Sequence, residues 1–168
     1  MTNIGVNDIE TAVRARVAEL VTPGVEVIDC DPGLADTAAF CAAYGYALDD
    51  SANAIVVAGK SDPPVYAMGL VLATTRLDVN NVVRKRLGTR KASFASGDAT
   101  AELTGMTIGG VTAFAAPGHL PIWVDAAVMT RDRIIVGGGS RSCKVVGPPA
   151  MLVELAGVEV VDGLARPL

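Results

Sequence analysis

Glycine-rich turns are the part of this chain with the clearest capacity for chemistry. They are Gly105, the pair Gly109-Gly110 and the run Gly137-Gly138-Gly139. A glycine has no Cβ, so the backbone beside it can take φ > 0 or approach a ligand closely. Turns of this kind can hold a carbonyl, ribose or phosphate through oriented N–H groups. The same residues also fit a helix C-cap at Gly105 followed by a β-turn, and both interpretations stand at this point.

Two further glycine-containing segments resemble catalytic motifs but lack the required spacing. Gly59-Lys60-Ser61 ends like a phosphate-binding loop, which needs a glycine at position 54 and a helix after the serine. The chain has Ala54 and Asp62-Pro63-Pro64 at those places. The segment from Gly138 would form a nucleophile elbow only with a glycine where Ser142 stands. No protein nucleophile with a paired base emerges.

The potential metal ligands are few and scattered. His119 is the one histidine, and three widely separated cysteines, Cys30, Cys41 and Cys143, give no paired ligand spacing. An odd number of spread cysteines fits buried thiols in a reducing cytoplasm. No apolar run is long enough to span a membrane, and the first ten residues lack the features of a signal peptide. We therefore expect a cytoplasmic protein without metal or cofactor.

Composition and charge favour one well-folded domain over residues 1–168, with a helix within 1–22 packed on it. Hydrophobic residues make up 51% of the chain and charged residues 19%. The net charge of −4 argues against general nucleic-acid binding. A local basic cluster is the exception, formed by Arg84, Lys85, Arg86, Arg90 and Lys91. It fits a solvated helix end favoured by the macrodipole, or a contact patch for the phosphates of an RNA stem.

Helical and strand-like segments are interspersed, and several strands follow one another without a helix between them. That order favours a mixed α/β fold with α+β character over a doubly wound nucleotide-binding fold. A capping box of Asn7 and Glu10 is expected to open the first helix. The predicted helices cover residues 7–20, 36–45, 78–88, 96–103 and 149–155. The predicted strands cover residues 25–28, 53–58, 65–73, 92–95, 122–125, 133–136, 143–146 and 158–161.

Two single polar residues each allow two interpretations. Asp125 ends a strand, so it can cap the turn over residues 126–129 or present a carboxylate to an amine at the mouth of a site. His119 lies between Pro117-Gly118 and Leu120-Pro121. It can be a surface-loop residue, or it can line a pocket and donate to a substrate carbonyl.

An ordered set of short motifs resembles the YbaK/EbsC family, which is related to the editing domain inserted in bacterial prolyl-tRNA synthetases. The resemblance covers about residues 25 to 160. No single motif is specific, but their order is. The motifs are Arg76-Leu77-Asp78, Leu87-Gly88, Leu103-Thr104-Gly105, Gly109-Gly110-Val111 with Phe114, a Pro-Ile-Trp-Val-Asp segment ending at Asp125, and Ile135-Val136-Gly137-Gly138-Gly139 followed by Ser140, Arg141, Ser142 and Lys144.

The resemblance implies a curved, partly barrel-like mixed β-sheet flanked by helices. It also implies trans-editing, the hydrolysis of the ester in a mischarged aminoacyl-tRNA, with a small amino acid on tRNA for proline. Backbone groups would hold the carbonyl, and a water helped by the ribose hydroxyl of the tRNA would attack it. The implied partners are aminoacyl-tRNA and an aminoacyl-tRNA synthetase, with no DNA and no membrane.

The same resemblance implies roles for individual residues. Gly109, Gly110 and Val111 would form the catalytic backbone cradle, with Asn53 and Asp125 lining the pocket. The basic cluster would contact the tRNA. The remaining substrate-binding residues would be Thr104, Gly105, Phe114, His119, Gly138, Gly139, Ser140 and Lys144.

The chain departs from the family pattern at two places. Asn53 stands where the family has a lysine, and Lys60 is a poor replacement because seven residues of strand span about 23 Å and end on the opposite face. Asn53 can donate a hydrogen bond but supplies no charge, or it is a strand-start residue bonded to a neighbouring turn. Ala113 and Ala115 replace a proline and a glycine. The missing lysine favours, as an alternative function, a binding module without turnover.

Overall fold

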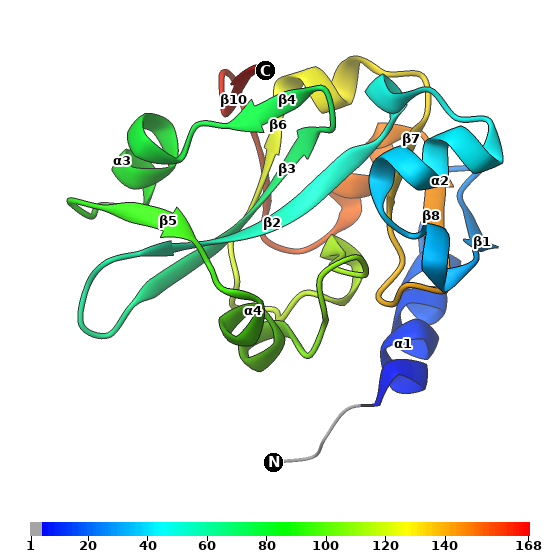
Figure 1. The fold of residues 1–168 in the computed structure, drawn as a ribbon, viewed down its shortest axis with the longest axis horizontal. Coiled ribbons are helices and arrows are strands. Elements are labelled where there is room, and N and C mark those ends of the chain that lie inside the picture. Colours follow the sequence, from blue (N-terminus) through cyan, green and yellow to red (C-terminus); the bar gives the residue numbers. More distant parts are fainter. Residues whose placement is uncertain (1–4) are drawn as a thin grey trace.

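The computed structural model describes residues 5–168, in which ten strands form three β-sheets with helices around them (Figure 1). The largest sheet has the strand order β5-β2-β3-β6-β9. β2 pairs antiparallel with β3 and β5, whereas β3–β6 and β6–β9 are parallel pairs. The predicted mixed fold is confirmed. The strands are β5 (Ala92–Phe94), β2 (Ala52–Gly59), β3 (Val65–Leu72), β6 (Ile122–Asp125) and β9 (Val158–Val161).

Two smaller sheets complete the described part of the chain. An antiparallel sheet contains β1 (Glu26–Asp29), β8 (Cys143–Gly147) and β7 (Ile134–Gly137), and a bridge between Ser51 and Ile135 connects it to β2. A further pair, β4 (Thr75–Leu77) with β10 (Ala165–Pro167), lies outside the predicted strands. Within residues 5–168 the sheets curve but do not close into a barrel.

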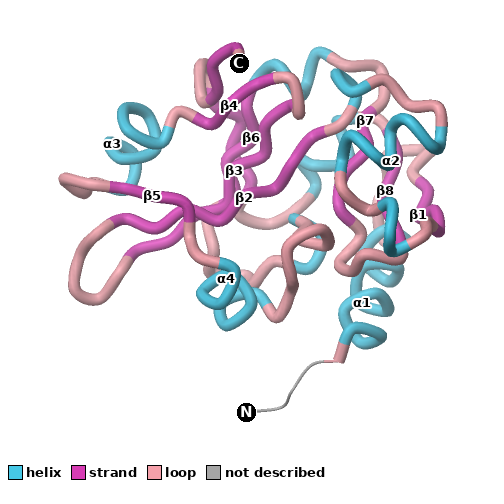
Figure 2. Tube along the Cα trace, viewed as in Figure 1, coloured by secondary structure: helices cyan, strands magenta, loops and turns pink. Residues whose placement is uncertain are grey.

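The helices flank the sheets, as Figure 2 shows. The α-helices are α1 (Val6–Ala18), α2 (Thr37–Tyr44), α3 (Arg84–Leu87) and α4 (Gly97–Thr104). A π-helical turn at Val79–Val83 occupies the first part of the helix predicted over 78–88. The helix predicted over 149–155 is a 3-10 helix, Pro149–Glu154. The other 3-10 turns are Pro32–Leu34, Leu48–Asp50, Ala113–Ala115 and Ala126–Thr130.

Most helix ends follow from local chemistry. The predicted capping box of Asn7 and Glu10 is wrong, because α1 begins at Val6 and the N–H of Gly5 donates to Asp8 Oδ2 at 3.1 Å. Ser96 Oγ caps α4 by accepting from the N–H of Ala99 at 3.0 Å. α4 ends at Gly105 with φ 74°, so the C-cap interpretation of that glycine is confirmed.

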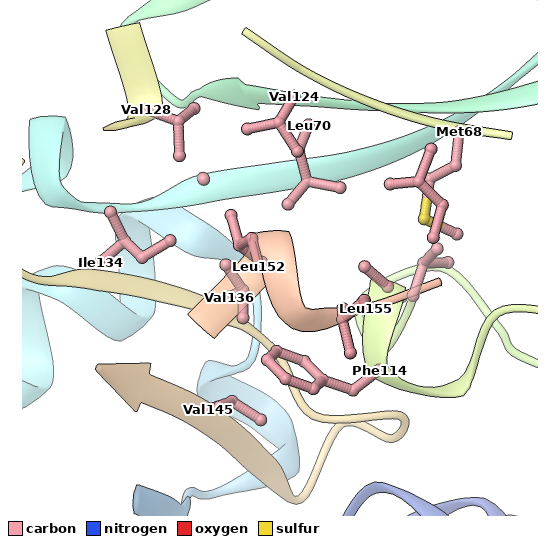
Figure 3. Close-up of a cluster of buried hydrophobic side chains, with 14 of the residues drawn as sticks. Met68, Leu70, Phe114, Val124, Val128, Ile134, Val136, Val145, Leu152 and Leu155 are labelled. Atoms are coloured by element: carbon pink, nitrogen blue, oxygen red, sulfur yellow. The ribbon is translucent and has the colours of Figure 1, made fainter. Parts of the chain in front are cut away.

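Both faces of the large sheet are buried, which fixes β2 firmly. The main core lies on one face and includes Ile9 and Val13 of α1. Figure 3 shows part of it, with Met68, Leu70, Phe114, Val136 and Leu152 pointing toward one another. A second cluster on the other face includes Val57, Val71, Val83 and Trp123.

A third, smaller cluster fixes α2 against the three-stranded sheet. It contains Phe40, Cys41, Cys30, Ile135 and Val146. All three cysteines are free and buried, as predicted, and burial raises the pKa of each thiol. The thiols are therefore unreactive core groups, and α2 is held rigidly beside the beginning of β2.

Candidate functional site

A cavity of about 290 Å³ lies between α2, α4 and one edge of β2. In Figure 1, β2 runs across the middle of the molecule, with α2 near one of its ends and α4 beside it. The cavity has two chemically different halves. The half toward α4 is mostly apolar and is lined by Val56, Ala95, Thr100 and Ile108. The half toward α2 is polar and is lined by Asp36, Thr37, Asn53 and Lys144.

The cavity exists because one edge of β2 is uncovered. β5 pairs with β2 only from Val57 to Gly59, and β7 reaches the other end of β2 only through the Ser51 bridge. The stretch between them, residues 52–56, borders the cavity. An unpaired strand edge offers backbone donors and acceptors in a row.

The register shows which backbone groups face this edge. Ser51 O accepts from Ala73 N–H at 2.8 Å on the β3 side, whereas Val56 O accepts from Ala95 N–H at 2.9 Å on the other side. In an antiparallel pair the peptide groups alternate between the two sides. The N–H and C=O of Ala54 therefore point into the cavity, where they offer one donor and one acceptor.

Asn53 begins the polar half of the cavity. Its Oδ1 accepts a hydrogen bond from Thr37 Oγ1 of α2 at 2.8 Å, which leaves the Nδ2 amino group as the side chain's donor. Asn53 therefore lines the cavity, and its partner is the first residue of α2 and not the neighbouring turn that was expected.

Lys144 brings a buried ammonium group into the same half. It lies on β8 and is 8% exposed, and its Nζ donates to the carbonyl oxygen of Ala35 at 2.7 Å. The ammonium also lies 5.5 Å from the ring centroid of Phe40. Burial lowers the pKa of Lys144 below its ordinary value. Lys144 was expected among the substrate-binding residues, but the pairing of β8 with β7 and β1 could not be read from the sequence.

The glycine turns serve close packing of two segments beside the cavity. Gly110 donates to Thr107 O at 3.0 Å and accepts from Gly139 N–H at 2.9 Å. A Cβ on Gly110 would lie 2.7 Å from Ser140 Cα, and a Cβ on Gly137 would overlap the carbonyl oxygen of Val111. Gly109 and Val111 line the cavity, whereas Gly110 does not.

Arg141 connects three segments around the cavity, and sequence reasoning gave it no role. Its Nε donates to Pro32 O at 3.1 Å and its Nη1 to Asp36 Oδ1 at 3.1 Å. Its side chain also fills the space beside Gly109, which has φ +95°. Arg141 therefore holds the polar and the glycine-turn walls together.

Comparison with known proteins shows which family has these features. The aminoacyl-tRNA editing domain family matches residues 31–155, a range that includes α2, β2, the three glycine-rich turns and β8. This chain belongs to that family. The resemblance to YbaK-type editing domains is thereby confirmed, and aminoacyl-tRNA editing is the function the family supports.

Solved structures show that the fold of this editing domain recurs at low sequence identity. A crystal structure of a candidate trans-editing enzyme for prolyl tRNA synthetase superposes with a TM-score of 0.78 and 21% identity, covering 92% of this chain and 95% of that one. The hypothetical protein APE2540 gives a TM-score of 0.78 and 22% identity, covering 94% and 99%. At these identities the likeness establishes the fold alone.

Several residues expected at the site of this editing domain lie elsewhere. Asp125 is buried under β10, where its Oδ1 accepts from the N–H groups of Leu164 at 3.0 Å and Ala165 at 3.3 Å. Its side chain does not cap the turn over 126–130. His119 is exposed in its loop. Neither Asp125 nor His119 lines the cavity described above.

A second group of expected site residues packs around α1. Thr104 and Phe114 line a separate groove along α1, together with Ala115, and Phe114 and Ala113 belong to the main core. Gly105 caps α4 beside Ile9. The loop containing Gly138, Gly139 and Ser140 also contacts α1, where Ser140 Oγ donates to Glu10.

The basic cluster of the editing domain includes side chains that are engaged by other residues of the chain. Arg86 forms an ion pair with Glu159 and lies 4.9 Å from the ring of Trp123, and Arg84 Nε donates to Asn80 O at 2.9 Å. The other three members, Lys85, Arg90 and Lys91, are exposed. Within residues 5–168, no group of His, Cys, Asp or Glu side chains is arranged to hold a metal ion, and no helix could cross a membrane.

Proposed function

We propose that this chain hydrolyses the ester bond of mischarged aminoacyl-tRNA in trans, in the cavity between α2, α4 and β2. The observation that carries the proposal is the cavity's division into an apolar half and a half lined by hydrogen-bond donors. Its volume of about 290 Å³ suits a small aminoacyl group. The apolar half would take the amino-acid side chain, and the donors would hold the ester.

The chemistry needs no protein nucleophile. The N–H of Ala54 and the Nδ2 of Asn53 are donors that can orient the ester carbonyl, and a water can attack it with help from the ribose hydroxyl of the tRNA. Gly109 and Val111 would form the wall opposite β2. We propose a small amino acid on tRNA for proline as the substrate, delivered with or without a synthetase, in the cytoplasm.

We also propose that residues 1–168 form one domain. Ile9 and Val13 of α1 are 5% and 0% exposed within the main core, so the first helix shares its core with the sheets.

The direct test is deacylation of a panel of mischarged tRNAs by the purified protein. We expect at least one small amino acid on tRNA for proline to be released faster than in buffer. A panel in which every ester decays at the buffer rate would overturn the proposed hydrolysis.

A binding module without turnover is the second candidate, because Asn53 supplies no charge. The variant Asn53→Lys separates the two functions. We expect wild-type activity and an approximately tenfold lower kcat/KM in the variant, because it loses the Thr37 hydrogen bond and places a second ammonium beside Lys144. Deacylation kinetics on the best substrate measure the change. Activity that appears only in Asn53→Lys would instead favour the binding module.

The exposed lysines of the basic cluster are proposed to contact tRNA phosphates. With a net charge of −4, the chain should bind tRNA weakly and with strong salt dependence. We expect Lys85→Ala with Lys91→Ala to reduce the slope of log K against log salt by roughly 2. Filter binding at several salt concentrations measures the slope. Arg16→Ala, at an exposed position of α1, is the control and should leave the slope unchanged. Equal slopes for all three proteins would exclude this patch.

A further inference from the structure

The ammonium of Lys144 is buried and forms no salt bridge with a carboxylate among the described residues. Its hydrogen bond goes to Ala35 O, the Phe40 ring lies 5.5 Å away, and Asp36, Cys30 and Cys41 act on it only through longer-range electrostatics. The one carboxylate of the cavity wall, Asp36, is bound by Arg141 at 3.1 Å. Removing an ammonium from water is strongly unfavourable unless partners compensate. One carbonyl uses one of its three N–H donors, so Lys144 retains donors for a ligand.

The strand pairing directs this side chain into the cavity. Lys144 lies opposite Gly137 in the β7–β8 ladder, and both residues line the cavity. Because Gly137 has no side chain, the backbone carbonyl of Val111 packs beside it, and Ile28 of β1 lies opposite Lys144 in the other ladder. The result is a cation in the polar half, in the same wall as Asn53.

A role in holding the loop over residues 31–36 does not account for Lys144. Arg141 already binds that loop at Pro32 and at Asp36, and Asp31 Oδ1 accepts from the N–H of Gly33 at 2.8 Å. An apolar side chain of similar length would fill the space without the desolvation cost. Charged groups kept in a cavity at such a cost cluster at functional sites.

We propose that the Lys144 ammonium binds the carbonyl oxygen of the substrate ester and stabilises the negative charge that develops on it. This inference rests on the proposed hydrolysis and identifies Lys144 as the group that stabilises its transition state electrostatically. Water oxygen bonds to the carbonyl carbon, and the carbonyl π electrons move to the oxygen beside Lys144. The attacking water gives up a proton through the neighbouring ribose hydroxyl. When the intermediate collapses, the C=O bond re-forms, the bond to the ribose oxygen breaks, and that oxygen takes up this proton. A cation held in a low-dielectric site favours this transition state strongly.

The test compares binding of two adenosine analogues, so it does not require turnover. One carries an aminoalkyl phosphonate monoester at the 3′ position, which resembles the anionic intermediate, and the other carries a neutral 3′ amide. We expect the wild type to bind the phosphonate at least tenfold more tightly than the amide, and Lys144→Met to lose that preference. Calorimetry measures both affinities, and Lys60→Met, an exposed lysine outside the cavity, is the control.

Thermal unfolding accompanies the binding measurements. Lys144→Met should melt at or above the wild-type temperature, because it replaces a buried charge with an apolar group. An unchanged phosphonate preference in a folded Lys144→Met variant, or a wild type that binds neither analogue, would overturn the inference. The proposed hydrolysis fails separately, if the phosphonate preference is present but no mischarged tRNA is deacylated.

Discussion

Replacing Gly137 with alanine is expected to lower the free energy of unfolding by about 3 kcal/mol. The added Cβ would overlap the carbonyl oxygen of Val111 and lie 3.0 Å from its carbonyl carbon. Both obstacles are backbone atoms, so neither can rotate away as a side-chain tip could. The segments at residues 107–111 and 137–140 must separate, which also displaces a wall of the cavity. Denaturant unfolding measures the loss, and deacylation should fall with it.

A matched glycine shows whether the loss comes from crowding. At Gly118, no atom lies within 4 Å of the position that an added Cβ would occupy, and the backbone does not take a positive φ. Gly118→Ala should therefore change stability by no more than about 0.5 kcal/mol. If Gly137→Ala unfolds at the same denaturant concentration as Gly118→Ala, the two segments are not in backbone contact.

These glycines show which structural features can be predicted from neighbouring residues in the sequence. The stop of α4 at Gly105 was predictable, because a C-cap depends on neighbouring residues. The role of Gly110 was not, because its close neighbour is Ser140, thirty positions along the chain. The sequence of a glycine pair does not show whether its backbone contacts a ligand or packs against a second loop.

The side chains expected at the site show the same limit. The existence of β2 and of α2 followed from periodicity and turn residues. Asp125 was expected at the mouth of a site because it ends a strand, yet its partners are backbone groups at residues 164 and 165. Lys144 reaches the cavity through strand pairings with β1 and β7. Which side chains meet depends on the order of strands in the sheets, which the motif order and family resemblance do not give residue by residue.

The uncovered edge of β2 leads to the second large effect. Ala54→Pro removes the N–H that points into the cavity without removing a hydrogen bond to β3. Proline is tolerated in strands where its missing N–H faces away from the ladder. We therefore expect a folded protein in which deacylation falls by about 100-fold, the loss typical for one donor to a developing oxyanion. Ala54→Gly keeps the N–H and should remain within a few-fold of wild type.

The neighbouring residue is the matched control for the register. Ile55 lies opposite Gly69, and the alternation established at Ser51 and Val56 directs its N–H toward β3. Ile55→Pro should therefore be less stable than Ala54→Pro by about 1–3 kcal/mol, because a buried carbonyl of β3 loses its donor. Equal stabilities in denaturant would contradict the register. Full activity in a folded Ala54→Pro variant would show instead that the edge N–H does not touch the substrate, which would leave the side chains of Asn53 and Lys144 as the donors that hold the ester.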